Sequence, residues 1–252
     1  MGHIFDQKLV RLYEAWEKSP EGVSLDRLST QLIIRLLKPQ RGERILDIGC
    51  GTGNHLLLFH RLGLDVTGID ASPYMLDIAR SRLGNKASLK IGRAEDLPFD
   101  DNEFDVATLI YTLEFLDDTY AALREVVRVA KHRVFVGVLN GLSLGCIGNK
   151  CYALFHDTIF REAQLFTLWG LKNSVKKVCG NVPMEWGSVQ VMPFFLRKYS
   201  ERIEMSPVLQ SSPFGRFLGL VFEMTYTLRT ESLRVTERLK KEAESPAGTS
   251  GF

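Results

Sequence analysis

The residues with the clearest chemical potential lie between Asp47 and Asn54, in the run Asp-Ile-Gly-Cys-Gly-Thr-Gly-Asn. The three alternating glycines let the backbone turn tightly and lie close to a bound molecule. A buried strand is predicted before them and a helix after them, and this kind of turn is where open α/β sheets bind small molecules. The dinucleotide fingerprint G-x-G-x-x-G would need a glycine where Asn54 stands. The sequence places a carboxylate, Asp47, before the first glycine instead.

A second carboxylate, Asp70, ends the next predicted strand. An acidic side chain at the tip of the second strand can accept hydrogen bonds from ribose hydroxyls. Ser72 and Pro73 follow it, and they are suited to cap and begin a helix. The glycine loop alone would fit any nucleotide-type turn between a strand and a helix, and Asp70 adds a group that suits a ribose.

The spacing D-x-G-x-G-x-G resembles motif I of the class I methyltransferases that use S-adenosylmethionine. Residues 92–99 read Gly-Arg-Ala-Glu-Asp-Leu-Pro-Phe, and Phe104-Asp105 follow. That order is similar to the G-D-A-E-x-L-P-F … F-D segment of the ubiquinone/menaquinone methyltransferase-like group (methyltransferase type 11). Phe5-Asp6, Tyr13 and Trp16 fit the group's opening outline, F-D-x-x-A-x-x-Y-x-x-W. The resemblance is specific over residues 44–139 and holds in outline over residues 5–195.

The resemblance implies S-adenosyl-L-methionine as cofactor. In the family, the position of Asp47 reaches the methionyl amino group, that of Met75 touches the adenine, and that of Tyr13 closes over the cofactor. This cofactor carries an ammonium and a sulfonium but no phosphate, which suits a carboxylate better than a row of backbone N–H groups. Met75 fits a plain core position equally well, and Tyr13 fits an amphipathic cover helix. The implied cofactor-binding residues are Asp47, Gly49, Gly51, Gly53, Asp70, Ala71, Met75, Arg93, Ala94, Glu95, Ile110 and Tyr13.

Arg93 departs from the family pattern, which has Asp at this position to accept from the adenine amino group. Arginine cannot accept a hydrogen bond. Two interpretations follow. Either Glu95 takes over that contact, or backbone groups at Arg93 and Ala94 hold the adenine while the Arg93 side chain stacks or faces solvent.

Methyl transfer from a sulfonium is an in-line displacement, so the protein acts mainly by positioning its reactants and excluding water. A neutral oxygen or nitrogen acceptor must also lose a proton, and Tyr111, Glu114 and His156 are candidate bases. Each fits equally as a residue of the lid or the pocket wall. A carbanion or thiolate acceptor would need no base. The sequence therefore names no catalytic residue and leaves the acceptor open.

Composition narrows the class of protein. The formal net charge is +2, which shows no footprint of a nucleic-acid binder. The four cysteines, at positions 50, 146, 151 and 179, have no finger-like partners, so no metal is expected. No apolar run reaches about 18 residues and the N-terminus is no signal peptide, so we expect no membrane span and a cytoplasmic protein.

Strands and helices alternate along the chain, which predicts a parallel sheet. The resemblance extends this to an α/β, Rossmann-like, seven-stranded, mostly parallel sheet with helices on both faces and a C-terminal antiparallel hairpin. The expected strands are Arg44–Ile48, Asp65–Asp70, Ser88–Ile91, Phe104–Tyr111, Arg133–Leu139, Val189–Phe195 and Arg216–Met224. The expected helices are Phe5–Lys18, one capped by Ser24, Asn54–Arg61, Pro73–Leu83, one capped by Asp117 and Asp118, and Leu168–Cys179.

We expect one methyltransferase domain over residues 1–228, with cover helices in 1–40, a substrate lid in 140–163 and a polar, flexible tail in 229–252. Apolar residues in the lid favour a hydrophobic small-molecule acceptor. His55 and His60 are expected at the surface or at helix ends, and Arg124 and Glu125 are expected to be surface charges. Two other functions stay open: a non-catalytic partner subunit that binds S-adenosylmethionine or S-adenosylhomocysteine, and a nicotinamide-dependent oxidoreductase.

Overall fold

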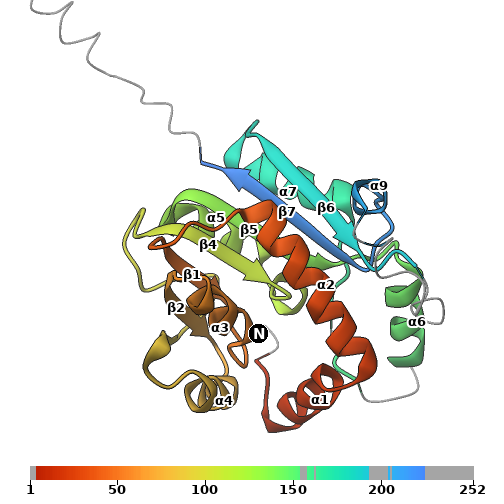
Figure 1. Ribbon diagram of the computed structural model, residues 1–252, viewed down its shortest axis with the longest axis horizontal. Helices are drawn as coiled ribbons and strands as arrows, with labels where there is room; N and C mark the ends of the chain where they lie inside the picture. The colour runs from red at the N-terminus through yellow and green to blue at the C-terminus, as the bar shows by residue number, and fades with distance from the viewer. Residues whose placement is uncertain (1–3, 154–157, 162, 193–203, 205, 225–252) are drawn as a thin grey trace, which may run out of the picture.

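A seven-stranded sheet runs through the protein in the order β3-β2-β1-β4-β5-β7-β6 (Figure 1). The computed structural model describes residues 4–153, 158–161, 163–192, 204 and 206–224. β1 to β5 are parallel, and β7 runs antiparallel to both β5 and β6. The strands are β1 (Arg44–Ile48), β2 (Asp65–Asp70), β3 (Ser88–Ile91), β4 (Phe104–Ile110), β5 (Ala130–Leu139), β6 (Met184–Val189) and β7 (Phe217–Glu223). The predicted fold class is confirmed.

Helices cover both faces of the sheet and form the outer two of three layers. One apolar layer packs α1 (Gln7–Glu17), α2 (Pro20–Leu37), α3 (Asn54–Arg61) and α4 (Pro73–Leu83) against the sheet. The opposite layer holds α5 (Thr119–Val129) and α7 (Leu168–Cys179). Two further helices, α6 (Leu144–Ala153) and the short α9 (Pro207–Gln210), lie near the carboxyl end of β5. β4 is buried along almost its whole length, as expected for a strand covered on both faces.

Local capping residues set most helix starts. Asp6, Ser72 and Asp118 each accept a hydrogen bond from a backbone N–H in the first turn of the helix that follows. The predicted start of the second helix at Ser24 is wrong. Ser19 caps that helix by accepting from the Gly22 N–H at 3.1 Å, and Pro20 occupies its first turn, which leaves Ser24 buried inside it.

The predicted strand at Val189–Phe195 is also wrong, because β6 ends at Val189. Beyond it, the backbone N–H groups of Val191 and Met192 donate to the Glu204 carboxylate at 3.1 and 2.6 Å, so a side chain satisfies them in place of a neighbouring strand. Residues 193–195 lie outside the described residues. β6 itself contains Glu185, Gly187 and Ser188, whose types seldom favour a strand. It forms because it pairs with β7, a contact between segments far apart in the sequence.

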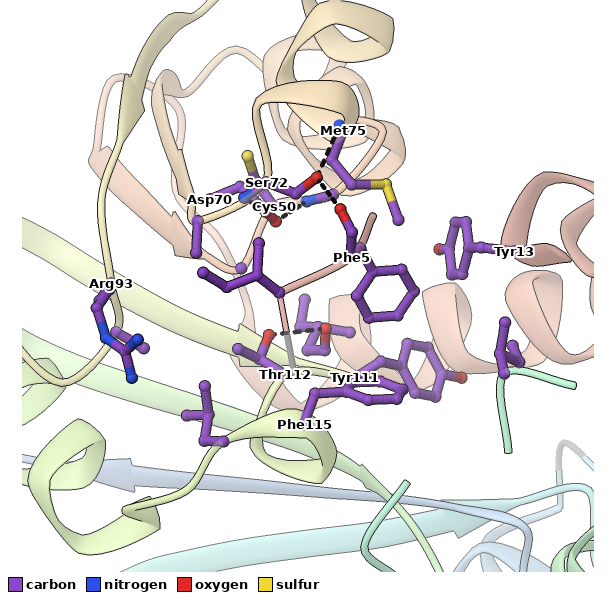
Figure 2. A pocket seen from close by; sticks show the side chains of 18 of the residues that line it. Phe5, Tyr13, Cys50, Asp70, Ser72, Met75, Arg93, Tyr111, Thr112 and Phe115 are labelled. Carbon is purple, nitrogen blue, oxygen red and sulfur yellow. Dashed lines mark hydrogen bonds between the residues drawn. The ribbon is translucent and has the colours of Figure 1, made fainter. Parts of the chain in front are cut away.

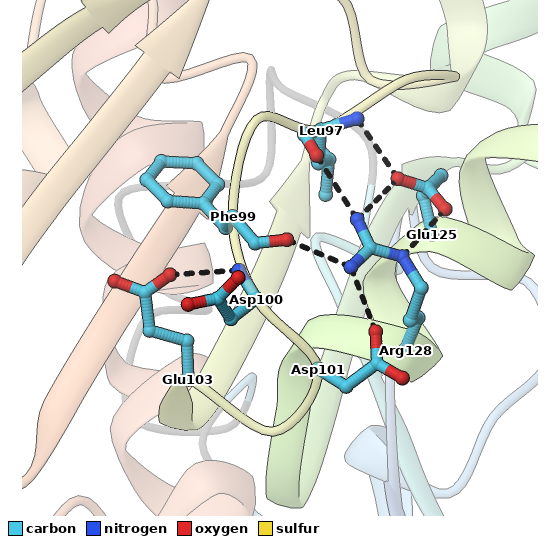
Figure 3. Close-up of polar contacts among 7 residues, drawn as sticks. All are labelled: Leu97, Phe99, Asp100, Asp101, Glu103, Glu125 and Arg128. Carbon is cyan, nitrogen blue, oxygen red and sulfur yellow. Dashed lines mark hydrogen bonds and ion pairs between the residues drawn. The ribbon is translucent and has the colours of Figure 1, made fainter.

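Arg128 on α5 ties the segment between β3 and β4 to the sheet (Figure 3). Its guanidinium donates to the carbonyl oxygens of Leu97 and Phe99 at 3.0 and 2.7 Å and pairs with Asp101 at 2.9 Å. Glu125 accepts from the same guanidinium at 2.7 Å and from the Leu97 N–H at 2.8 Å. Glu125 is therefore not the free surface charge that the sequence predicted, whereas Arg124 is exposed as expected.

Replacing Arg128 with alanine should destabilise the protein by about 2 kcal/mol, because two carbonyl groups and two carboxylates lose a charged hydrogen-bond donor together. Urea unfolding measures this loss. Arg124→Ala, on the same helix and exposed, is the matched control and should change the free energy of unfolding by less than about 0.5 kcal/mol. Equal effects of the two substitutions would contradict the structural role of Arg128.

Candidate functional site

A cavity opens at the carboxyl ends of β1, β2, β4 and β5, next to the point where the strand order reverses between β1 and β4. Eleven residues predicted for the site contribute to its lining: Tyr13, Gly49, Gly51, Asp70, Ala71, Met75, Arg93, Ala94, Glu95, Ile110 and Tyr111. The sequence motifs, which are spread over about a hundred positions of the chain, therefore converge on one cavity.

Three predicted residues do not line the cavity, and a fourth lies outside the described residues. Asp47 is buried beneath the glycine loop, and Gly53 caps α3. Glu114 is fully buried, and its Oε1 accepts from the Leu139 N–H at 2.6 Å. Burial raises the pKa of Glu114 to about 8. The fourth residue, His156, is outside the described part of the chain.

The glycine loop has a backbone conformation that residues other than glycine rarely adopt. Gly49 and Gly53 have φ values of +73° and +82°. A Cβ atom on Gly49 would lie 2.4 Å from Thr112 of the loop after β4, so only glycine fits there. Asp70 fixes the loop from the neighbouring strand, since its Oδ2 accepts from the Gly51 N–H at 2.8 Å. Its Oδ1 accepts from the Ser72 N–H, also at 2.8 Å.

Two carboxylates lie on the adjacent strands β1 and β2 at this site, Asp47 buried and Asp70 partly buried. Asp47 is 1% exposed, and its Oδ1 accepts from the Thr108 hydroxyl at 2.7 Å. Burial raises the pKa of Asp47 to about 7, despite the Thr108 hydrogen bond and with a contribution from the negative charge of Asp70. Burial also raises the pKa of Asp70, while hydrogen bonds from Ser72, Gly51 and Ala71 act against it. Such a pair favours a cationic ligand, because a nearby positive charge stabilises both ionised carboxylates.

Arg93 and Glu95 form one rim of the cavity. The Arg93 guanidinium pairs with Glu95 Oε1 at 3.2 Å, and Arg93 is exposed. The geometry is compatible with both interpretations of Arg93, which stands where the family has Asp. Glu95 keeps a second carboxylate oxygen that could accept from the adenine, and Ala94, whose backbone could hold the adenine, also lines the cavity.

Aromatic side chains from distant segments form the other side of the cavity. Figure 2 shows Phe5, Tyr13 and Phe115 across from Arg93. Phe5 makes edge contacts with Phe115 at 4.9 Å and with Tyr13 at 6.2 Å between ring centroids. The Phe5 carbonyl accepts from the Ser72 hydroxyl at 2.6 Å, which draws the N-terminal segment over the cavity.

Helix α1 is attached to the glycine loop through its last residue. The Glu17 carboxylate accepts from the Thr52 hydroxyl at 3.3 Å and from the Asn54 amide. It also pairs with Arg82 of α4 at 3.5 Å. Tyr13 and Trp16, one turn or less before Glu17, are thereby held against the cavity.

Several lining residues were missed by the sequence analysis: Ile4, Cys50, His55, Ser72, Gly92, Thr112, Phe115, Leu116, Leu139, Ile159 and Phe160. The sequence predicts His55 at the surface or at a helix end, and the structure places it in the first turn of α3, where it lines the cavity. Its position at the second residue of the helix that follows the glycine loop was the available signal. Burial lowers the pKa of His55 to about 4, so it is neutral at physiological pH.

Within the described ranges, no group of three or more His, Cys, Asp or Glu side chains could hold a metal ion. None of the helices in those ranges has the length and apolar character needed to cross a bilayer.

Residues 46–136 match the methyltransferase domain family. An O-methyltransferase of Aspergillus nomiae is 32% identical over 142 residues, which are 54% of this chain and 63% of that protein. A demethylmenaquinone methyltransferase of Corynebacterium kroppenstedtii is 37% identical over 107 residues, which are 42% of this chain and 45% of the relative. The chain thus spans less than two thirds of the length of either relative.

A solved S-adenosylmethionine-dependent methyltransferase of Thermotoga maritima has the same architecture, with a TM-score of 0.64 and 24% identity. The similarity covers 86% of this chain and 97% of that one. At this identity the likeness establishes the fold. The segment that matches the family holds the glycine loop, Asp70 and the Arg93–Glu95 rim, as the sequence resemblance predicted. Residues 46–136, which hold these motifs, are the part of this chain that matches the methyltransferase domain family.

Proposed function

We propose that the protein is an S-adenosylmethionine-dependent methyltransferase that acts on a small molecule. The observation that carries the proposal is the pair of carboxylates at and beneath the glycine loop, Asp47, which is buried, and Asp70, which is partly buried and lines the cavity. Neither has a lysine or arginine partner among the described residues, which suits a ligand that brings its own positive charge. They would repel a dinucleotide pyrophosphate.

The proposed roles follow the sequence resemblance. Asp70 would act on the ribose hydroxyls and the Arg93–Glu95 rim on the adenine. Asp47, which lies beneath the loop and does not line the cavity, would act on the methionyl ammonium directly or through water. Gly49 and Gly51 would let the backbone approach, and Tyr13 would cover the ligand. When bound, S-adenosylmethionine supplies an electrophilic methyl group on a sulfonium. The chain itself must orient the acceptor in line with the methyl group and exclude water. Such positioning can lower the activation free energy by about 7–11 kcal/mol.

The part of the cavity away from Asp70 and Arg93 is apolar and aromatic, with Trp16, Tyr111 and Phe160 in its lining. This wall supports a mainly hydrophobic acceptor. We also propose that residues 1–228 form one methyltransferase domain, with α1 and α2 as its cover and residues 140–163 as the substrate lid. In support, α1 and α2 pack on the same apolar layer as α3 and α4, and Ile159 and Phe160 of the lid segment line the cavity.

Isothermal titration with S-adenosylmethionine, S-adenosylhomocysteine and NADH tests the cofactor. We expect micromolar binding of the first two and none of NADH. Binding of NADH alone would overturn the proposal in favour of an oxidoreductase. Incubation with methyl-labelled S-adenosylmethionine and a small-molecule panel then separates an enzyme from a non-catalytic binding subunit, which would retain the ligand without turnover.

Substituting Asp47 with asparagine should separate stability from binding. The pKa of Asp47 is about 7 in the folded protein and 3.8 as its ordinary value, so its ionisation destabilises the ligand-free fold as pH rises from about 4 to 7. Asp47→Asn should therefore raise the melting temperature at about pH 8 and leave it nearly unchanged at about pH 4. Its affinity for S-adenosylmethionine at the higher pH should fall about 10-fold or more, because the carboxylate charge is lost.

The matched control for that experiment is Asp65→Asn, an exposed position on the neighbouring strand β2. It should move neither the melting temperature nor the affinity at either pH. A drop in the melting temperature of Asp47→Asn at the higher pH would show that its carboxylate stabilises the fold, contrary to the argument from burial.

Asp70→Asn should weaken cofactor binding at least about 10-fold, because one of the two oxygens that accept from Gly51 and Ser72 becomes an amide donor. Asp77→Asn on α4, which is exposed, is the comparison variant and should bind as the parent protein does. Both affinities are measured by titration with S-adenosylhomocysteine. Unchanged binding by the Asp70 variant would remove Asp70 from the site.

A further inference from the structure

Charge is unevenly distributed around the cavity. Its charged lining residues are Asp70, Arg93 and Glu95, which come from the end of β2 and the segment after β3. The lining from α1, α3 and the ends of β4 and β5 carries no formal charge once His55 is neutral. Glu21, Glu114 and Arg216 lie in this region of the protein, but none of them lines the cavity, and Arg216 is paired with Glu21.

His55 is the polar side chain best placed in this uncharged part. It occupies the first turn of α3, directly after the glycine loop, and its ring lies beside Tyr111 with 6.4 Å between centroids and 33° between planes. Its Nε2 atom is buried and has no hydrogen-bond partner within the described residues. A buried polar atom that is left unpaired is unfavourable, so a ligand group that forms a hydrogen bond with it gains affinity.

The neighbours of His55 are rigidly held. The Tyr111 N–H donates to the Gly137 carbonyl at 2.8 Å, and its ring packs on Phe217 at 4.9 Å. Trp16 packs edge-on against Phe160 at 5.8 Å, and its buried indole N–H has no partner in the described part of the chain. This leaves an indole donor and a neutral imidazole among aromatic walls.

These groups select a class of ligand. A neutral imidazole nitrogen can donate or accept, so the His55 ring suits the oxygen atom of a hydroxyl or carbonyl group. An anion would find no lining cation there, and a cation would find aromatic faces but no carboxylate. Apolar ring surfaces suit a flat apolar frame around that oxygen.

We propose that His55 is the positioning residue for the methyl acceptor, and that the acceptor is an uncharged, ring-containing molecule whose hydroxyl or carbonyl oxygen hydrogen-bonds to His55. This inference rests on the proposed function, since it assigns the acceptor end of the same cavity.

The test uses the full chain saturated with S-adenosylhomocysteine and three probes of one shape: a naphthol, a naphthoate and a naphthylmethylammonium. Isothermal titration should show the naphthol binding at least about 10-fold more tightly than either charged probe, which is a difference of about 1.4 kcal/mol. Equal binding, no binding of the naphthol, or a preference for a charged probe would overturn the inference. Failure of S-adenosylhomocysteine itself to bind would instead overturn the proposed function, and the inference with it.

Variants then assign the effect to His55. His55→Leu should weaken naphthol binding about 10-fold, and His55→Asn, which keeps a donor and an acceptor, should restore most of the loss. His60→Leu, on the same helix and exposed, is the control and should leave it unchanged. The affinity for S-adenosylhomocysteine should stay within about 2-fold in all three. A parallel loss of cofactor affinity in His55→Leu, or equal naphthol binding by His55→Leu and His60→Leu, would refute this role.

Discussion

The site depends on two carboxylates near the carboxyl ends of adjacent parallel strands, Asp47 buried in the interior and Asp70 partly buried at the cavity. Burial disfavours the ionised form of Asp47 and Asp70, and each must be compensated by hydrogen-bond donors. The donors come from separate places, namely the Thr108 hydroxyl on β4 and backbone N–H groups at Gly51 and Ser72. The same contacts that compensate the carboxylates also fix the glycine loop and the start of α4. The hydrogen bonds that stabilise the fold in this region therefore also hold the two carboxylates ready for a positively charged ligand.

The sheet supplies the geometry for this arrangement. Parallel pairing of β1 with β2 and β4 brings three loops to one edge, and helices on both faces exclude water from the strands. Arg128 holds the segment before β4, so the Arg93–Glu95 rim is carried by a loop that is tied down at its far end. The cavity thus has a rigid floor and rim, while its aromatic side comes from elements added around the sheet.

Sequence patterns predicted the parts that are determined locally. Strand and helix periodicity located β1 to β4 closely, and the glycine loop and Asp70 identified the ligand edge because their spacing is set by one βαβ unit. The place of β6 and the roles of His55 and Glu125 could not be predicted in the same way. Each depends on a contact between segments far apart in the chain, namely β6 with β7, His55 with Tyr111 and Glu125 with Leu97. The start of α2 is set by a local cap instead, and the error there was to choose Ser24 over Ser19 and Pro20. The aromatic wall is likewise assembled from α1, the end of β4 and residues 159–160.

The attachment of α1 has a kinetic consequence. Glu17 makes polar bonds to the glycine loop and to α4, and the segment before α1 is held by the hydrogen bond from Ser72 to the Phe5 carbonyl and by the packing of Phe5 on Phe115. These contacts are separate from the strand pairing, so the cover can open while the sheet beneath stays intact. The residence time of a ligand bound under Tyr13 is then set by the rate at which α1 opens locally. Substitutions in α1 can change that rate without changing the rate of global unfolding.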